Sequence, residues 1–97
     1  MKRIALTPAA RGDLSGIRSY TIKVWGFHQA EFYLASLGAL FRNLAEGAKI
    51  SQTVGRGNYR KARFRSHMIY FAVSDDEIEI VRVLHVSMDA ERHLPNP

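Results

Sequence analysis

The spacing of apolar residues along this chain changes once, near the middle of the sequence. After a short strand-like stretch at Lys2–Leu6, apolar side chains recur every three or four positions up to about residue 45. That spacing places them on one face of an α-helix. From residue 60 the apolar positions alternate with polar ones or run together, which is typical of strands. The pattern therefore predicts a strand, a helical segment and then a sheet.

The helical segment divides into two helices at Gly26. The apolar face of the first helix consists of Ala10, Leu14, Ile17, Thr21 and Val24. The apolar face of the second consists of Ala30, Leu34, Leu37, Phe41 and Leu44. Thr7 and Pro8 suit the N-cap and the first position of the first helix, and Gly26 and Gly47 suit the two ends. So short a connection predicts an antiparallel hairpin, which Trp25 and Phe27 would close with apolar contacts.

The second half predicts a three-stranded meander. Residues 47–58 are a glycine-rich loop, and the strands that follow are residues 60–65, 68–73 and 78–85, with turns at Ser66-His67 and Asp75-Asp76. In the first of these strands Ala62 and Phe64 face one side, while Lys61, Arg63 and Arg65 face the other. A short helix or tail is expected from Met88 to Leu94.

These elements predict an α+β fold of the order β-αα-βββ, with the helix hairpin packed on one face of a small antiparallel sheet. Residues 1–97 would form one domain, because the chain is too short for two. Residues 95–97 are expected to fray. The other face of the sheet has little left to cover it and is expected to remain open for binding.

Composition excludes several classes of protein. The chain has 46% hydrophobic residues and no cysteine, which argues against disorder, disulfides, Cys-based zinc sites and thiol catalysis. The longest apolar run, Met68–Val73, is too short to span a membrane. We therefore expect a soluble, cytoplasmic protein.

The positive charge is concentrated in one window. The net charge is +5, and residues 56–65 contain five basic residues and no acidic one, so the rest of the chain is neutral. A cluster of this kind suits an anionic partner or an acidic protein surface. Charged side chains also protect an edge strand from aggregation. The sequence leaves both interpretations open.

The remaining polar residues give weaker signals. No two of the four histidines have the spacing of a metal site, so neither a metal nor another cofactor is expected. His85, at the end of the last strand, could be a general base, a polar group at a partner surface or a hydrogen-bonded structural residue. Arg82, inside an apolar strand, must be paired. Glu79, an acid of the Asp75–Glu77 turn or a partner protein could supply the carboxylate.

No nucleophile–base arrangement can be recognised, so no catalytic residue is assigned. Three segments, however, resemble the ParE branch of the RelE/ParE toxin superfamily, in the family's order. They are Leu6–Ala10 with Asp13-Leu14, Ile17, Trp25-Gly26 and Gln29–Glu31; Gly57–Lys61; and Ser66-His67 with Glu79–His85 and Ser87–Asp89. The likeness covers roughly residues 4–94.

The resemblance implies the toxin of a type II toxin–antitoxin pair. ParE toxins poison DNA gyrase, are not themselves known as enzymes, and are neutralised by a small ParD-type antitoxin made beside them. Nucleic acid would then be met only through the target enzyme. We expect the antitoxin to contact Arg60, Lys61, Arg63 and Arg65, with apolar contacts from the helix hairpin. We expect the target to contact the stretch that holds His85, Met88, Asp89 and Arg92.

The RelE branch, which cleaves mRNA in the ribosome, is the main alternative. Its active site uses cations on the second strand, an arginine opening the third strand, an arginine after the fourth and a C-terminal tyrosine. This chain keeps the second-strand cations as Lys61, Arg63 and Arg65. The two arginine positions are occupied by Met68 and, approximately, Met88. No tyrosine follows Tyr70, so the C-terminal tyrosine is also missing. The third strand, Phe71-Ala72-Val73, also lacks the tyrosine and arginine frequent in ParE proteins. A non-toxic nucleic-acid-binding module is a third hypothesis.

Overall fold

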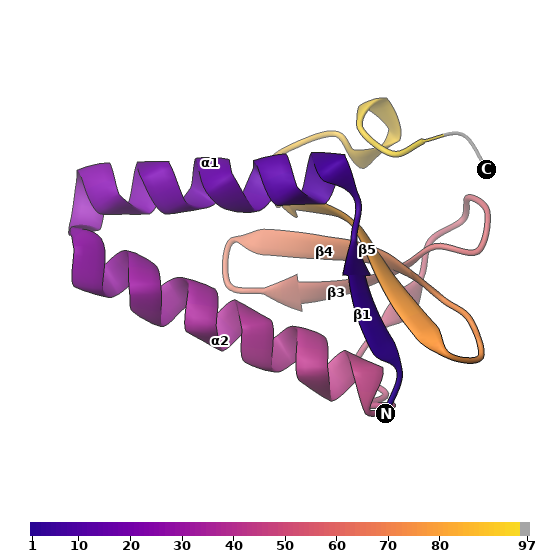
Figure 1. Cartoon of the computed structure of the whole chain (residues 1–97). Coiled ribbons are helices and arrows are strands. Elements are labelled where there is room, and N and C mark those ends of the chain that lie inside the picture. Colours follow the sequence, from indigo (N-terminus) through magenta and orange to yellow (C-terminus); the bar gives the residue numbers. More distant parts are fainter. Residues whose placement is uncertain (96–97) are drawn as a thin grey trace.

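The computed structural model describes residues 1–95, and its elements follow the predicted order (Figure 1). They are β1 Arg3–Leu6, α1 Pro8–Trp25, α2 Phe27–Ala45, β2 Gln52–Thr53, β3 Arg60–Phe64, β4 His67–Val73, β5 Glu77–His85 and the 3-10 turn η1 Ala90–Arg92. The α+β class and the β-αα-βββ order are confirmed. One short strand, β2, lies inside the segment predicted as a loop. Asn96 and Pro97, which were expected to fray, are outside the described residues.

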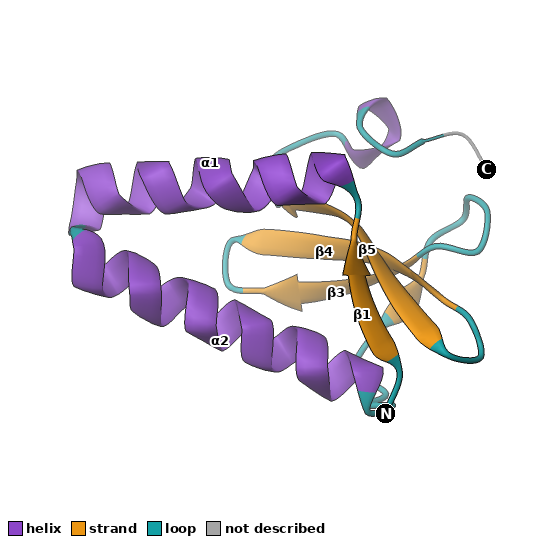
Figure 2. Cartoon of the chain, in the orientation of Figure 1, coloured by secondary structure: helices purple, strands orange, loops and turns teal. Residues whose placement is uncertain are grey.

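The helix hairpin begins and turns at the predicted residues. The Thr7 hydroxyl accepts a hydrogen bond from the Ala10 N–H at 3.0 Å, and Pro8 occupies the first helical position. Gly26, with a φ of +95°, both ends α1 and precedes α2. Since this φ lies in the left-handed region, a residue with a side chain would be strained there. The helices diverge from this turn, and the β3–β4 hairpin lies between them in the view of Figure 2.

The sheet differs from the prediction at its edge. Its order is β1-β5-β4-β3-β2, and β3, β4 and β5 form the expected antiparallel meander. The prediction of an all-antiparallel sheet is wrong, because β1 lies parallel to β5, with Ile4 beside Ile78 and Leu6 beside Ile80. Ile4 and Leu6 pack against the same buried cluster as those two residues. Burial of the apolar side chains of β1 therefore explains its place beside β5.

The turn between β3 and β4 lies one residue earlier than predicted. It is formed by Arg65 and Ser66, and His67 is already the first residue of β4. Arg65 has a φ of +53° and is the one residue other than glycine with positive φ among residues 1–95. The sequence did not indicate a turn at Arg65, because arginine, unlike glycine or asparagine, is not typical of a left-handed turn position. Arg65 is therefore not part of the strand face predicted for it.

The core lies between the helices and the sheet. The core side chains are almost completely buried. The largest of those with less than 2% of their surface exposed are Leu37, Ile69, Ile78 and Ile80. The predicted face of α2 is buried, except that Leu34 is half-buried. The face of α1 is buried at Ala10 and Thr21 but not at Val24, which is 48% exposed. The apolar stripe of α1 thus continues past the end of the core.

The opposite face of the sheet is partly covered, whereas the prediction left it open. Tyr70, Val81 and Leu84 form a second buried cluster there, and Leu94, at 6% exposure, belongs to it. The segment after β5 folds back to reach this cluster, as the yellow end of the chain in Figure 1 shows. The C-terminal segment therefore acts as part of the core.

Arg82 is paired, but not with the predicted carboxylates. Its guanidinium donates two hydrogen bonds of 2.8 Å to Asp13 of α1, and one of 3.0 Å to the main-chain oxygen of His93. Glu79 is instead exposed. The sequence could not identify Asp13, because only the packing of α1 against the free end of β5 brings it to Arg82.

Candidate protein-interaction surfaces

The four cations predicted to contact a partner do not share one surface. Lys61 and Arg63 lie beside Tyr70 and Met68 of β4 and so face away from the helices, since strand neighbours in register share a face. In residues 1–95 neither of the two forms an ion pair with a carboxylate. We call Lys61 and Arg63 the basic face. Their charges are available to an acidic partner.

Arg60 has a structural role. Its guanidinium donates to the Ser51 hydroxyl at 2.7 Å and to the Ser51 main-chain oxygen at 3.1 Å, and the residue is half-buried. These bonds hold the segment that leads from α2 into β2. Arg60 is therefore a weaker candidate for partner contact than Lys61 and Arg63.

Arg65 faces a groove between the helix hairpin and the end of the sheet. This groove encloses about 630 Å³, and Ile17, Tyr20, Trp25, Tyr33 and Met88 form its apolar and aromatic walls. Three of these side chains are exposed to an unusual degree for their type: Trp25 at 70%, Tyr20 at 65% and Met88 at 49%. We call it the hairpin groove. Exposed apolar groups gathered at one site are typical of an interaction surface.

The sequence did not assign these aromatic residues to a site. Trp25 and Phe27 were predicted to close the hairpin, but Phe27 is also 54% exposed, so neither is buried by the turn. Tyr20 carried no signal of its own. One feature of the sequence did point to an exposed apolar surface here. The apolar face of α1 continues to the last turn of the helix, beyond the part that packs on the core.

Two histidines lie at the sheet end of the hairpin groove. His67 and His85 are direct neighbours on β4 and β5, with ring centroids 5.7 Å apart. Nδ1 of His67 is hydrogen-bonded to the Tyr33 hydroxyl at 2.6 Å. Burial and, less strongly, the neighbouring His85 lower the pKa of His67, against a smaller opposing effect of Asp13. Burial also raises the pKa of Tyr33. Near neutral pH both groups therefore favour their uncharged forms.

The hydrogen bonds of His85 define which ring atom carries its proton. The Ser87 N–H donates to Nδ1 of His85 at 3.1 Å, and the Ser87 hydroxyl lies 2.7 Å from the same atom. A backbone amide can only donate, so Nδ1 is the acceptor and the neutral ring carries its proton on Nε2. His85 can therefore offer an N–H to a ligand in the groove.

The residues expected to contact the target lie in two places. His85 and Met88 both line the hairpin groove. Asp89 instead caps η1, accepting from the Glu91 N–H at 3.1 Å, and forms an exposed ion pair of 3.6 Å with Arg92. The structure thus brings His85 and Met88 together with Arg65 in the hairpin groove. Asp89 and Arg92 lie apart from them, on the C-terminal turn.

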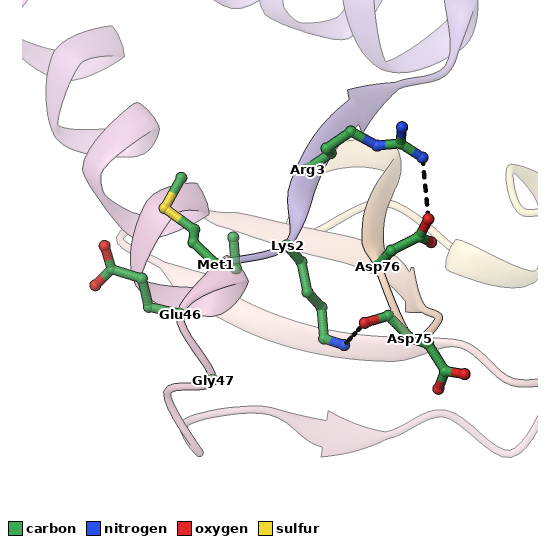
Figure 3. Close-up of a pocket in the computed structure, with 8 residues that line it drawn as sticks. Met1, Lys2, Arg3, Glu46, Gly47, Asp75 and Asp76 are labelled. Atoms are coloured by element: carbon green, nitrogen blue, oxygen red, sulfur yellow. Dashed lines mark hydrogen bonds and ion pairs between the residues drawn. The ribbon is translucent and has the colours of Figure 1, made fainter.

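A second hollow, of about 670 Å³, lies at the N-terminal end of the sheet (Figure 3). Its basic groups are already engaged: Arg3 pairs with Asp76 at 3.2 Å, and Lys2 Nζ donates to the main-chain oxygen of Asp75 at 2.8 Å. These contacts join β1 to the β4–β5 turn. The hollow therefore has an evident structural use.

Residues 1–95 contain neither a metal-binding cluster nor a membrane-spanning helix. Nowhere in that part of the chain do three or more His, Asp or Glu side chains gather so that they could hold a metal ion. No helix in it combines the length and hydropathy that crossing a bilayer requires.

Comparison with known proteins gives the family. The model of the ParE toxin of type II toxin–antitoxin systems, parDE, matches residues 4–90. This chain belongs to the ParE toxin family. The resemblance drawn from its sequence segments is confirmed, and the coarse function follows: it is the toxin component of a type II toxin–antitoxin system.

Individual ParE relatives match over almost their whole length. Toxin ParE1 of Caulobacter vibrioides is 36% identical over 96 residues, which cover 97% of this chain and 99% of the relative. Toxin ParE1 of Mycobacterium tuberculosis is 37% identical over 95 residues, covering 95% and 97%. A solved structure described as the chromosomal ParDE system of P. aeruginosa superimposes with a TM-score of 0.76 at 20% identity, covering 90% of this chain and 98% of that one. That last match shows a shared fold.

Proposed function

We propose that this ParE-family chain inhibits DNA gyrase and is neutralised by a ParD-type antitoxin, without catalysing a reaction itself. The observation that carries the proposal is family membership over nearly the whole chain, residues 4–90. The surfaces of the molecule agree with a protein that acts by binding. Two kinds of group suit binding: the cations Lys61 and Arg63, which form no ion pair with a carboxylate in residues 1–95, and exposed aromatic side chains such as Trp25.

The basic face suits an antitoxin segment that is rich in carboxylates. Lys61 and Arg63 present two charges from one strand, and the half-buried Met68 beside Arg63 adds apolar surface. A disordered acidic segment that folds on its partner gains affinity from both kinds of contact. We therefore place part of the antitoxin contact here. Arg65 is assigned to the hairpin groove instead.

The alternative of a ribosome-dependent mRNA interferase is disfavoured by the neighbours of these cations. The RelE-type active site would need an arginine opening β4, but the residue beside Arg63 is Met68. Arg82, the cation nearest along β5, is occupied by Asp13. Without an arginine at the start of β4, the charge that develops on a scissile phosphate would lack one of the groups that stabilise it in a RelE-type site.

Growth after induction in a bacterial host tests the proposal. Expression of the toxin should arrest growth and induce the DNA-damage response, and co-expression of the antitoxin encoded beside it should restore growth. Primer extension on translated mRNA from arrested cells should show no new cuts. Codon-specific cuts would support the interferase instead, and arrest without a DNA-damage response would contradict gyrase as the target.

A further inference from the structure

The hairpin groove has an apolar end and a donor-rich end. The exposed aromatic rings of Tyr20 and Trp25 lie toward the helix turn, and Arg65, His67 and His85 lie toward the sheet. Within the described residues, 1–95, no aspartate or glutamate lines the cavity. A ligand that fills it must therefore combine apolar surface with a negative charge.

Arg65 and His85 at the sheet end can donate to a carboxylate, and His67 can do so when its Nε2 carries a proton. Arg65 brings a permanent charge, and Nε2 of His85 carries a proton because Nδ1 accepts from Ser87. Nδ1 of His67 is occupied by Tyr33, which leaves its Nε2 for a ligand. Arg65 lies within 5.6 Å of the Phe64 ring, a contact that holds the guanidinium near the turn. The arrangement matches one acidic side chain better than a long anionic polymer.

We propose that the hairpin groove is a docking site for the antitoxin, which inserts an apolar side chain against Tyr20 and Trp25 and a carboxylate between Arg65 and the His67–His85 pair. This inference rests on the proposed pairing with a ParD-type antitoxin and adds a second contact surface to the basic face. Charge complementarity selects the occupant, since the apolar walls are combined with Arg65 and two histidines, and no acid of residues 1–95 lines the groove.

Proton uptake should accompany this contact. The groups facing His67 are Tyr33 from α2, Arg65 from the turn, His85 from β5 and, at longer range, Asp13 from α1. A carboxylate placed beside the His67 imidazole favours its protonated form. Antitoxin affinity should therefore rise as pH falls from 8 to 6. The rise should be smaller in the variant His67→Gln.

The test measures the affinity of the full-length antitoxin, encoded beside the toxin, for purified toxin variants. Trp25→Ala and Arg65→Asn should each weaken binding about tenfold or more, as central contacts do. Asparagine is chosen at residue 65 because it tolerates the positive φ there. Phe32→Ala and His28→Gln change an exposed aromatic and an exposed histidine outside the groove, and should bind as wild type does.

The binding test has three outcomes that lead to different conclusions about the hairpin groove. If the wild type binds antitoxin and the groove variants, shown folded by circular dichroism, bind it equally well, the groove proposal is wrong and the proposed function stands. If the groove variants bind antitoxin normally but lose their effect on gyrase, the groove belongs to the target, which also overturns the proposal. If wild-type toxin does not bind the antitoxin, both proposals fail.

Discussion

Arg82 and Asp13 are 69 residues apart in the sequence and form a two-pronged ion pair, with both nitrogen–oxygen distances at 2.8 Å. Their side chains are only 20% and 14% exposed. Asp13 also accepts the Val83 N–H at 2.9 Å, where β5 extends beyond its neighbour β1. One carboxylate thus joins α1 to the free edge of β5, and through Arg82 to the C-terminal segment.

Asp13→Asn should destabilise the protein by about 2–4 kcal/mol, because it leaves a largely buried guanidinium without its counter-charge. Urea unfolding followed by circular dichroism measures this loss. Arg18→Ala is the matched control, since it breaks an exposed pair of 3.3 Å with Glu31 and should cost at most about 1 kcal/mol. Equal stability of the two variants would show that the Asp13–Arg82 pair is dispensable.

Thr7 should be sensitive to the loss of its hydroxyl. This group accepts from the Ala10 N–H at 3.0 Å and donates to the Val81 main-chain oxygen at 2.7 Å, so it caps α1 and ties it to β5. Thr7→Val removes both bonds and should cost about 1–2 kcal/mol, whereas Thr7→Ser keeps them. A serine variant as unstable as the valine variant, in the same unfolding assay, would show that the methyl group matters instead.

His67 should make stability depend on pH. Its pKa in the folded protein lies below its ordinary value, so near pH 6.5 and below the unfolded chain binds a proton more readily than the native one. The free energy of unfolding should therefore fall as pH is lowered from 7.5 to 5. His67→Gln should lose part of this dependence. An identical pH profile in the variant would contradict the assigned burial of the imidazole.

The basic face should affect partner binding and not folding. Lys61→Ala and Arg63→Ala should each weaken antitoxin binding by about 0.2–1 kcal/mol, the usual range for exposed charges. The difference from wild type should shrink when ionic strength is raised, since salt screens exposed charges. Calorimetric titrations at two salt concentrations measure both effects. Arg60→Ala should instead lower the melting temperature, because it releases Ser51.

Most of the fold could be predicted because its signals are local. The two apolar faces, the cap at Thr7 and the glycine at residue 26 each specify their element without help from distant parts of the chain. The parallel pairing of β1 with β5 and the partner of Arg82 depend on how finished elements pack. Spacing along the sequence holds no information about either.

The candidate site was harder to predict for a related reason. The cluster of basic residues suggested one surface, but alternation along β3 and the turn at Arg65 separate its members. Leu94 provides a second example, since an apolar residue near the C-terminus gave no sign that it would cover the sheet. Surfaces are made by residues from several elements, so they emerge only when the chain is folded.

A gyrase cleavage assay with purified components tests whether this toxin inhibits DNA gyrase. Supercoiled plasmid is incubated with gyrase, ATP and this toxin, with and without the antitoxin, and linear DNA released by protein denaturation is measured. Toxin should raise the amount of linear, gyrase-linked DNA, and antitoxin should prevent the rise. Unchanged gyrase cleavage and supercoiling, with toxin that arrests growth in cells, would contradict the proposed inhibition of gyrase.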